Sequence, residues 1–290
     1  FQKMLPGSTQ FPDGPFTMED RSMLRHAMLM SSENLRLDDE ATAAGEVADF
    51  KAAGGTAIVE TGSPGIRSWE DVVAFRRISE QTGVHIVACT GLYAEDSWPE
   101  QFRGLTQEQY ADYLRGEIAN GIGDSGSRPG QIKVAYEGSS ESADAYLRAA
   151  AGVSRESGLS LQVHVGLTLS NDLMRSSFLP LLYGSGCVPE RTLICHVENW
   201  LGPLQVTDLV RDPQSVPRDL TLHREVLDRG FNLCFTLFGA EWDTEGLGVA
   251  HRPDWFYMAG MLPLIEEGYA GQLFVGHDVF TKSQTRRGGG

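Results

Sequence analysis

The sequence contains no long run of apolar residues. Its longest such stretches have the length of single strands, for example Thr56–Val59 and His85–Ala88, whereas a membrane-spanning helix needs roughly 20 apolar residues. The first residues, Phe1–Gln10, also lack a basic segment followed by an apolar one, which is the pattern of a secretory signal. We therefore expect a soluble, cytoplasmic protein whose native N-terminus lies upstream of Phe1.

Basic residues and paired cysteines are also scarce. There are 24 Lys and Arg against 39 Asp and Glu, a formal net charge of −15, and such a surface repels nucleic acids and anionic membranes. We expect a small neutral or electrophilic substrate instead, and a homodimer is compatible with the sequence. The four cysteines show no C-x-x-C spacing, which favours buried, reduced thiols.

Short β-branched runs alternate with amphipathic segments along the chain, a pattern typical of a parallel sheet with helices outside. Eight runs are expected to be strands: Met23–Leu29, Thr56–Thr61, His85–Gly91, Gln131–Tyr136, Ser160–Val165, Thr192–Val197, Asn232–Phe238 and Gln272–Asp278. Apolar residues at three- and four-residue spacing predict six helices: Glu40–Ala53, Trp69–Thr82, Gln107–Asn120, Ala143–Ser157, Leu220–Arg229 and Trp255–Glu267. No G-x-G-x-x-G follows the first run, so we predict a closed (β/α)8 TIM barrel and not an open Rossmann sheet.

We expect residues 1–290 to form one domain, with 1–22 as an N-terminal extension. The last expected strand ends only twelve residues before Gly290, so the eighth helix of the barrel is missing from the sequence. Without that helix part of the apolar wall would stay uncovered, and we therefore expect the native chain to continue beyond Gly290.

Five residues with metal-binding side chains stand near the carboxyl ends of five different expected strands. They are His26, Lys133, His164, His196 and Asp278. In a closed barrel these strand ends converge, and imidazole and carboxylate groups suit zinc, manganese, cobalt or iron. The pattern predicts a metal site on the catalytic face.

The same segments resemble a known family, the phosphotriesterase-like branch of the amidohydrolase superfamily, from about Met23 to Gly290. The segments that carry the resemblance are A-G-G-T-A-I-V-E at Ala53–Glu60, G-I-R at Gly65–Arg67, H-I-V-A-C-T-G-L-Y at His85–Tyr93, G-Q-I-K-V-A at Gly130–Ala135, V-H-V at Val163–Val165, C-H-V-E at Cys195–Glu198, and G-H-D-V-F-T-K with R-R-G-G-G within Gly276–Gly290.

The resemblance implies a binuclear metal site bridged by a carboxylated lysine, and Lys133 stands at that position. A buried lysine amine is pushed toward its neutral form, which can react with carbon dioxide to give an anionic ligand. The resemblance further implies that His164 and His196 bind one metal ion. It implies that Asp278 binds the other and takes up the proton of a metal-activated water, the nucleophile.

The resemblance is broken at the first expected strand. The family pattern there is H-x-H, whereas this sequence reads R-H-A-M, so that His26 fills the first place and Met28 the second. A thioether is a poor ligand for hard or borderline divalent ions. Whether one or two ions are held is therefore open, and so is their identity, with zinc as the first expectation.

Long loops follow the third, sixth and seventh expected strands, on the face where barrels carry their active sites. Aromatic and imidazole side chains in two of these loops predict substrate contacts by Tyr93, Trp242 and His251. His223 lies in a helical segment, and we expect it to be solvated.

These features predict a metal-dependent hydrolase that cleaves a lactone, a carboxyl ester or a phosphoester. Two alternatives stay open: a member with a degraded metal site that acts as a lyase, a cyclase or a binding protein, and a Schiff-base aldolase that uses Lys133. Structural roles are also open. Lys133 could pair with a buried carboxylate such as Glu60, the histidines could be core residues, and Asp278 could cap a loop.

Overall fold

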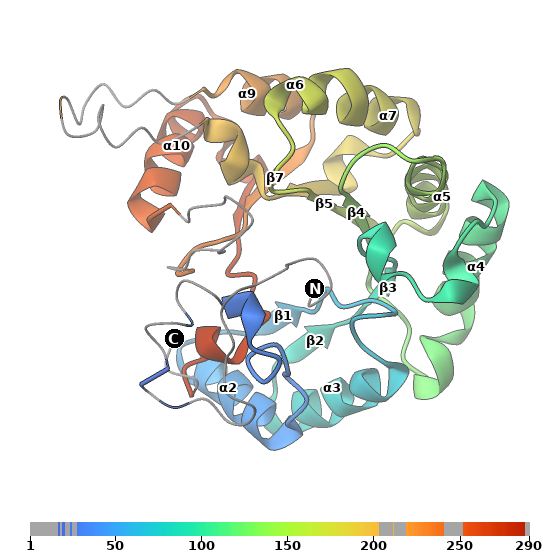
Figure 1. Cartoon of the computed structure of the whole chain (residues 1–290), viewed down its shortest axis with the longest axis vertical. Coiled ribbons are helices and arrows are strands. Elements are labelled where there is room, and N and C mark those ends of the chain that lie inside the picture. Colours follow the sequence, from blue (N-terminus) through green and yellow to red (C-terminus); the bar gives the residue numbers. More distant parts are fainter. Residues whose placement is uncertain are drawn as a thin grey trace.

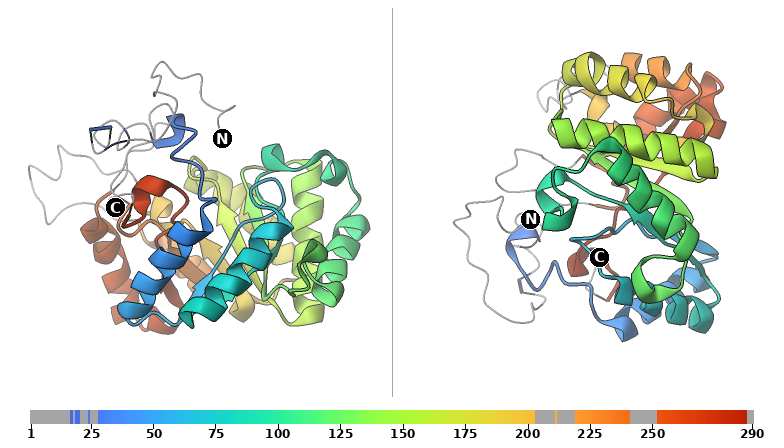
Figure 2. Two further views of the ribbon diagram at one scale, coloured as in Figure 1. Left: turned by 90° about the horizontal axis from the view of Figure 1, so that it is seen from below. Right: turned by 90° about the vertical axis from the view of Figure 1, so that its right-hand side faces the viewer.

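The computed structural model describes residues 17, 19–20, 24, 28–202, 211, 219–240 and 252–287. Three of the candidate site residues, His26, Trp242 and His251, lie outside this part of the chain. Strands lie at the centre and helices surround them on the outside (Figure 1). The two side views show the helices running along the outside of the strands (Figure 2).

The strands are all parallel to their neighbours. They are β1 Ala57–Val59, β2 His85–Val87, β3 Cys89–Gly91, β4 Gln131–Tyr136, β5 Ser160–Val165, β6 Thr192–Cys195, β7 Asn232–Phe235 and β8 Leu273–Val275. β1 pairs with β2, and β3 to β8 form a six-stranded sheet in chain order. β2 and β3 are two parts of one extended run that is interrupted at Ala88, and this run connects the two sheets. The fold is an α/β fold of the (β/α)8 barrel type.

The strand connections contain most of the expected helices. The structure has α2 Glu40–Ala52, α3 Trp69–Thr82, α4 Gln107–Asn120, α5 Glu141–Ser157, α6 Asn171–Leu173, α7 Leu179–Gly184, α9 Thr221–Leu227 and α10 Asp254–Glu266. A π-helical turn, Met174–Phe178, joins α6 to α7. Short 3-10 helices cover Met28–Met30, Glu95–Ser97, Glu100–Phe102, Gly123–Ser125, Pro189–Arg191, Val197–Leu201, Tyr269–Gln272 and Lys282–Gln284.

Local capping explains why several helices begin and end where the sequence predicts. Capping boxes of Ser68 with Asp71 and of Thr106 with Gln109 satisfy the first backbone N–H groups of α3 and α4. At the other end of α3, Gly83 takes the left-handed conformation that terminates a helix (φ 68°).

One expected strand is wrong at its carboxyl end, and one helical stretch was missed. Met28 and Leu29 do not belong to a strand, because a 3-10 helix begins at Met28, whose carbonyl accepts from Asn34 Nδ2 (3.0 Å). Met28 is buried in the apolar core, so its thioether has a packing role. The helical stretch between β5 and β6, residues 171–184, was not expected. Its π-turn and Pro180 at the start of α7 interrupt the regular helical periodicity.

Among the described residues, no helix is long and apolar enough to cross a membrane. The four cysteines are free thiols, and three of them, Cys89, Cys195 and Cys234, are buried, as expected for reduced thiols.

Tyr146 on α5 ties the strand that carries Lys133 to its neighbour. Its hydroxyl accepts from Leu92 N (2.7 Å) and donates to the Lys133 carbonyl (2.8 Å). Gly91 on β3 pairs with Lys133 on β4, and Gly91 has φ 125°, a conformation that favours glycine. A Cβ atom at Gly91 would lie 2.1 Å from the Lys133 carbonyl oxygen. The close approach of β3 to Lys133 therefore requires a glycine.

Replacing Gly91 with alanine should lower the free energy of unfolding by roughly 3 kcal/mol, because the new methyl group strains the backbone and pushes β3 away from Lys133. Gly116 on α4 is the matched control, since a Cβ there meets nothing within 4 Å. Gly116→Ala should raise the stability by about 0.5–1 kcal/mol. Urea unfolding of both variants measures the difference, and equal effects would contradict this account of Gly91.

Candidate active site

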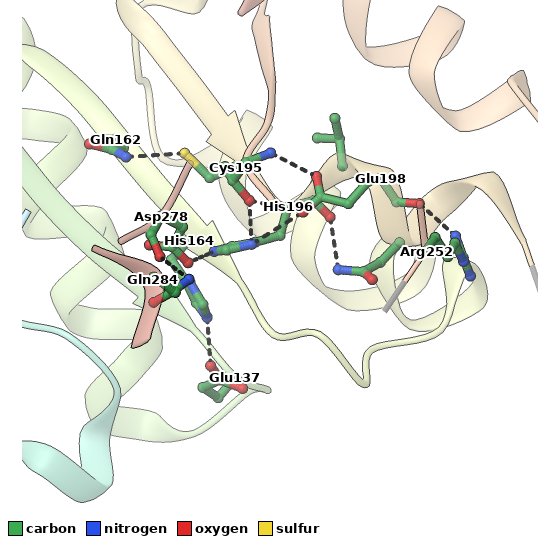
Figure 3. Close-up of polar contacts among 12 residues, drawn as sticks. Glu137, Gln162, His164, Cys195, His196, Glu198, Arg252, Asp278 and Gln284 are labelled. Atoms are coloured by element: carbon green, nitrogen blue, oxygen red, sulfur yellow. Dashed lines mark hydrogen bonds and ion pairs between the residues drawn. The ribbon is translucent and has the colours of Figure 1, made fainter. Parts of the chain in front are cut away.

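Three of the expected site residues come together at the carboxyl ends of the strands (Figure 3). His164 lies on β5, His196 follows β6, and Asp278 follows β8. The rings of His164 and His196 meet edge to face with their centroids 4.3 Å apart, and His196 Nε2 lies 3.9 Å from Asp278 Oδ2. Both imidazoles are buried, while the Asp278 side chain is 37% exposed. The cluster thus has a buried side and a side open to solvent.

His196 and Asp278 have a left-handed backbone, with φ values of 65° and 48°. They are the only residues other than glycine with positive φ in the described part of the chain. Such a conformation costs roughly 1–3 kcal/mol and is found most often where function requires it. Asn199 stabilises the turn at His196 through two hydrogen bonds to the His196 carbonyl. At the other turn, Gln284 Nε2 donates to the Asp278 carbonyl (3.2 Å). The expected strand Thr192–Val197 therefore ends two residues early, at Cys195.

Glu137, directly after β4, lies beside the His164 ring. Its Oε1 is 2.8 Å from His164 Nε2. Burial, together with the charges of His196 and Lys133, holds the pKa of His164 well below its usual range. The ring is therefore neutral, and beside the ionised form of Glu137, which can only accept, its proton lies on Nε2. This leaves the lone pair of His164 on Nδ1. Burial raises the pKa of Glu137 itself. Tyr93 also contacts this ring, with its hydroxyl 3.3 Å from Nε2.

His196 has a different set of partners. Its Nδ1 lies 2.6 Å from Thr236 Oγ1 and 3.5 Å from Glu198 Oε1. Burial lowers the pKa of His196, but the hydrogen bond and charge of Glu198 and the charge of Asp278 outweigh it, so the pKa is raised. Glu198 itself is 1% exposed and belongs to the 3-10 helix that starts directly after His196.

Lys133 is buried in the middle of β4, with 4% of its surface exposed. Its neighbours in register are Gly91 on β3 and Gln162 on β5. Within the described residues no hydrogen bond or ion pair of its amine is found. Glu60, the carboxylate considered as a partner, instead forms an ion pair with Arg67 (Oε2 to Nε, 3.1 Å). The structure therefore gives no support to a Lys133–Glu60 pair.

Sequence reasoning overlooked Glu137, Glu198 and Thr236 as parts of this cluster. Each stands within three residues after the end of a strand, where catalytic side chains of barrels gather. A signal was present for both carboxylates, because charged side chains that directly follow buried strands need a reason to be there. Thr236 gave no such signal, since a threonine in a strand-like run is ordinary.

The donor set in the described residues is incomplete. Within this part of the chain no three His, Cys, Asp or Glu side chains are grouped so that they could hold a metal ion. His26 lies outside the described residues. Of the five expected ligands, Lys133, His164, His196 and Asp278 are among the described residues.

A parallel barrel with buried histidines and a carboxylate at its strand ends defines a class of α/β enzymes whose chemistry takes place on this face. The sequence model of the Phosphotriesterase family matches residues 17–290. The chain belongs to this family.

Several similar proteins have the names of hydrolases. The human N-acetyltaurine hydrolase is 27% identical, over 95% of this chain and 74% of that protein, and the protein of the same name from Tetraodon nigroviridis is 25% identical, over 98% and 77%. A mutant of a PTE-like lactonase from Deinococcus radiodurans superposes with a TM-score of 0.65 and 26% identity, over 83% of this chain and 70% of that chain. The chain is thus an enzyme of the hydrolytic class.

Another solved structure has a different kind of name. A resiniferatoxin-binding protein from Rhodobacter sphaeroides superposes with a TM-score of 0.83 and 28% identity, over 96% of this chain and 72% of that chain. That name describes binding and not hydrolysis.

His223 on α9 supports the turn that begins at His196. The sequence analysis expected this side chain to be solvated, and that expectation is wrong. It is fully buried. Its Nε2 donates to the carbonyl of Val197 (2.9 Å), and its ring stacks on Phe235 with an interplanar angle of 10°. Burial lowers the pKa of His223 to about 4. A charged ring would be costly here, so folding holds this histidine neutral.

His223 should make the protein less stable as the pH falls. Between about pH 6.5, where the unfolded chain takes up the proton, and about pH 4, where the folded protein does, the unfolded state binds more protons and the stability decreases by roughly 3 kcal/mol. Urea unfolding of wild type and His223→Gln across this range measures the loss. The dependence of the unfolding free energy on pH should be weaker in His223→Gln than in wild type. It should be unchanged in His85→Gln, which removes an exposed imidazole. Equal slopes in all three proteins would contradict the assignment.

Proposed function

We propose that the chain is a metal-dependent hydrolase of the phosphotriesterase type. The observation that carries the proposal is the buried Lys133 amine, which has no partner among the described residues and lies on β4, next to the strand that carries the buried His164. An unpaired ammonium buried in this way costs several kcal/mol. Conversion to a neutral amine and then to a carbamate removes that cost if a cation balances the new negative charge.

The hydrogen bonding of His164 supports its role as a metal ligand. His164 has its proton on Nε2 toward Glu137, which leaves Nδ1 free to act as a ligand, and metal-binding histidines usually donate their second nitrogen to a carboxylate in this way. We propose His26, Lys133, His164, His196 and Asp278 as the ligands of one or two ions, with zinc as the first choice and manganese, cobalt or iron as others. When bound, the metal supplies Lewis-acid activation of water and of the scissile bond.

The side chains around the ligands have separate roles in this proposal. Asp278 is the proton acceptor, because its carboxylate lies 3.9 Å from His196 Nε2 and its side chain is 37% exposed, so that it can pass a proton outward. Glu137 keeps the His164 ring in place. Tyr93, Trp242 and His251 are proposed to contact the substrate; of these, Tyr93 lies next to His164 in the structure.

For the substrate we propose a carboxylic acyl compound, with lactones and carboxyl esters as the first class. The name of the N-acetyltaurine hydrolases adds N-acyl amides to the classes to be tested, and the lactonase neighbour supports the cyclic esters. The net charge of −15 disfavours multiply charged phosphoesters.

A second candidate function is ligand binding without hydrolysis, which the similarity to the Rhodobacter sphaeroides resiniferatoxin-binding protein favours. Met28 at the place of the second histidine could cost the site one metal ion. Such a site would suit a binding protein, and it would also suit a lyase or a cyclase. An aldolase that forms an imine at Lys133 is a third reading, and borohydride trapping with a carbonyl substrate tests it.

Lys133→Ala should lose its metal and at least 100-fold of the hydrolytic activity, because the carbamate is proposed to complete the site. Metal content by mass spectrometry and a screen of lactones, esters and N-acyl amides measure both effects. Short carboxylic acids should restore part of the metal binding by replacing the carbamate. Lys51→Ala is the control, because Lys51 is exposed on α2 and its amine donates to the Gly83 carbonyl. Full metal content and normal turnover in Lys133→Ala would disprove the proposal.

Gly166→Ala tests the role of Glu137 without changing a charged residue. A Cβ atom at Gly166 would lie 2.5 Å from Glu137 Oε2, so the flexible Glu137 side chain must move away from His164. Metal affinity should then fall about 10-fold, while the unfolding free energy changes by less than about 1 kcal/mol. Gly152→Ala on α5, which meets nothing within 4 Å, is the control. A metal affinity equal to that of wild type would show that Glu137 has no positioning role.

A further inference from the structure

We propose that Glu198, acting through the hydroxyl of Thr236, is a positioning residue that fixes the tautomer of His196 with the proton on Nδ1 and the lone pair on Nε2. The purpose of that lone pair, to hold a cation, rests on the proposed function. The tautomer itself does not, because it follows from hydrogen bonds within this chain.

The order of donors and acceptors follows from Glu198. A carboxylate only accepts, so the Thr236 hydroxyl donates its single proton to Glu198 Oε1 (2.9 Å). The same hydroxyl oxygen lies 2.6 Å from His196 Nδ1. Having already given its proton away, it must accept there, and His196 must carry a proton on Nδ1. The lone pair of a neutral ring then lies on Nε2, the nitrogen that faces Asp278.

Burial makes this arrangement exclusive. His196, Thr236 and Glu198 are 3%, 6% and 1% exposed, so water is not at hand to replace a lost partner. The second oxygen of Glu198 accepts from the backbone N–H of Thr236 (3.1 Å). Both oxygens of the carboxylate are therefore held by Thr236. If the ring carried its proton on Nε2 instead, the Thr236 hydroxyl would have to turn toward Nδ1 and would leave Glu198 Oε1 without its donor.

The relay also fixes the place of the ring. Glu198 belongs to the 3-10 helix after β6, and Thr236 directly follows β7, so the three groups join the ends of two neighbouring strands. Arg252, just before α10, donates to the backbone carbonyl of Glu198 (2.8 Å) and holds this helix from the other side. Figure 3 shows the network between His196 and Arg252.

Nitrogen NMR of the metal-free protein, with its histidines labelled with 15N, tests the proposal without any assay of activity. Long-range proton–nitrogen correlations report which ring nitrogen carries the proton, at a pH where the nitrogen shifts show that the His196 ring is neutral. Wild type should show His196 with the proton on Nδ1. Thr236→Ser keeps the hydroxyl and should give the same spectrum, whereas Thr236→Val should lose this tautomer or mix it with the other.

Thr192→Val is the matched control. Thr192 is also a fully buried threonine, and its hydroxyl donates to the Val188 carbonyl (2.8 Å) at the opposite end of β6. It should leave the His196 signals unchanged although it removes one buried hydrogen bond. A wild-type ring with its proton on Nε2, or a Thr236→Val spectrum identical to that of wild type, would overturn the proposal.

Zinc titration by calorimetry gives the second readout. Thr236→Val and Glu198→Gln should bind zinc 10- to 100-fold more weakly than wild type, the range found when partners of metal-bound histidines are removed, and Thr236→Ser should recover most of the affinity. If wild type itself binds no zinc, the proposed function fails while the NMR result still decides the relay. If wild type binds zinc and both variants bind it equally well, the positioning role is overturned.

Discussion

The candidate active site depends on where β6 stops. Side chains alternate between the two faces of a strand, and His164 on β5 pairs in register with Cys195, not with His196. If β6 continued, His196 would point to the face opposite His164 and away from the site. The left-handed turn at His196, with φ 65°, ends the strand and brings its ring to within 4.3 Å of the His164 ring centroid. One strained residue thus creates the histidine pair.

The second constraint is the burial of polar groups around that pair. Each imidazole uses one nitrogen for a partner inside the protein, Glu137 for His164 and Thr236 for His196. The buried Lys133 amine, by contrast, has none among the described residues. In a water-poor site, satisfied groups are fixed in position and an unsatisfied one is costly. The same burial therefore fixes the two rings in position and supports the proposal that Lys133 is carboxylated beside a cation.

The sequence predicted those elements that are determined locally or are buried on both faces. β4 and β5 have the predicted ends, because their apolar runs are bounded by turns, and α3 and α4 have the predicted ends because capping boxes mark their starts. The stretch 171–184 and the end of β6 could not be predicted. The first is an irregular helix with a π-turn. The second depends on a left-handed histidine, which only tertiary contacts can stabilise.

The same distinction applies to the site. His164, Lys133 and Asp278 could be named because strand ends of a parallel barrel converge, whereas Thr236 could not be named as the partner of His196, since it lies 40 residues away in the chain. His223 was placed wrongly for a related reason: the helical pattern does not show which polar residue of α9 faces the core, where this one binds the Val197 carbonyl.

The cost of this arrangement bears on the choice between an enzyme and a binding protein. Two strained backbone positions, His196 and Asp278, cost roughly 1–3 kcal/mol each, and a buried lysine with no partner among the described residues adds to that cost. A protein that only binds an apolar ligand could replace these residues with apolar ones and gain stability. Both strained residues meet at the one place where His196 Nε2 faces the Asp278 carboxylate. Strain and buried charge concentrated at this point favour chemistry at the strand ends over binding alone.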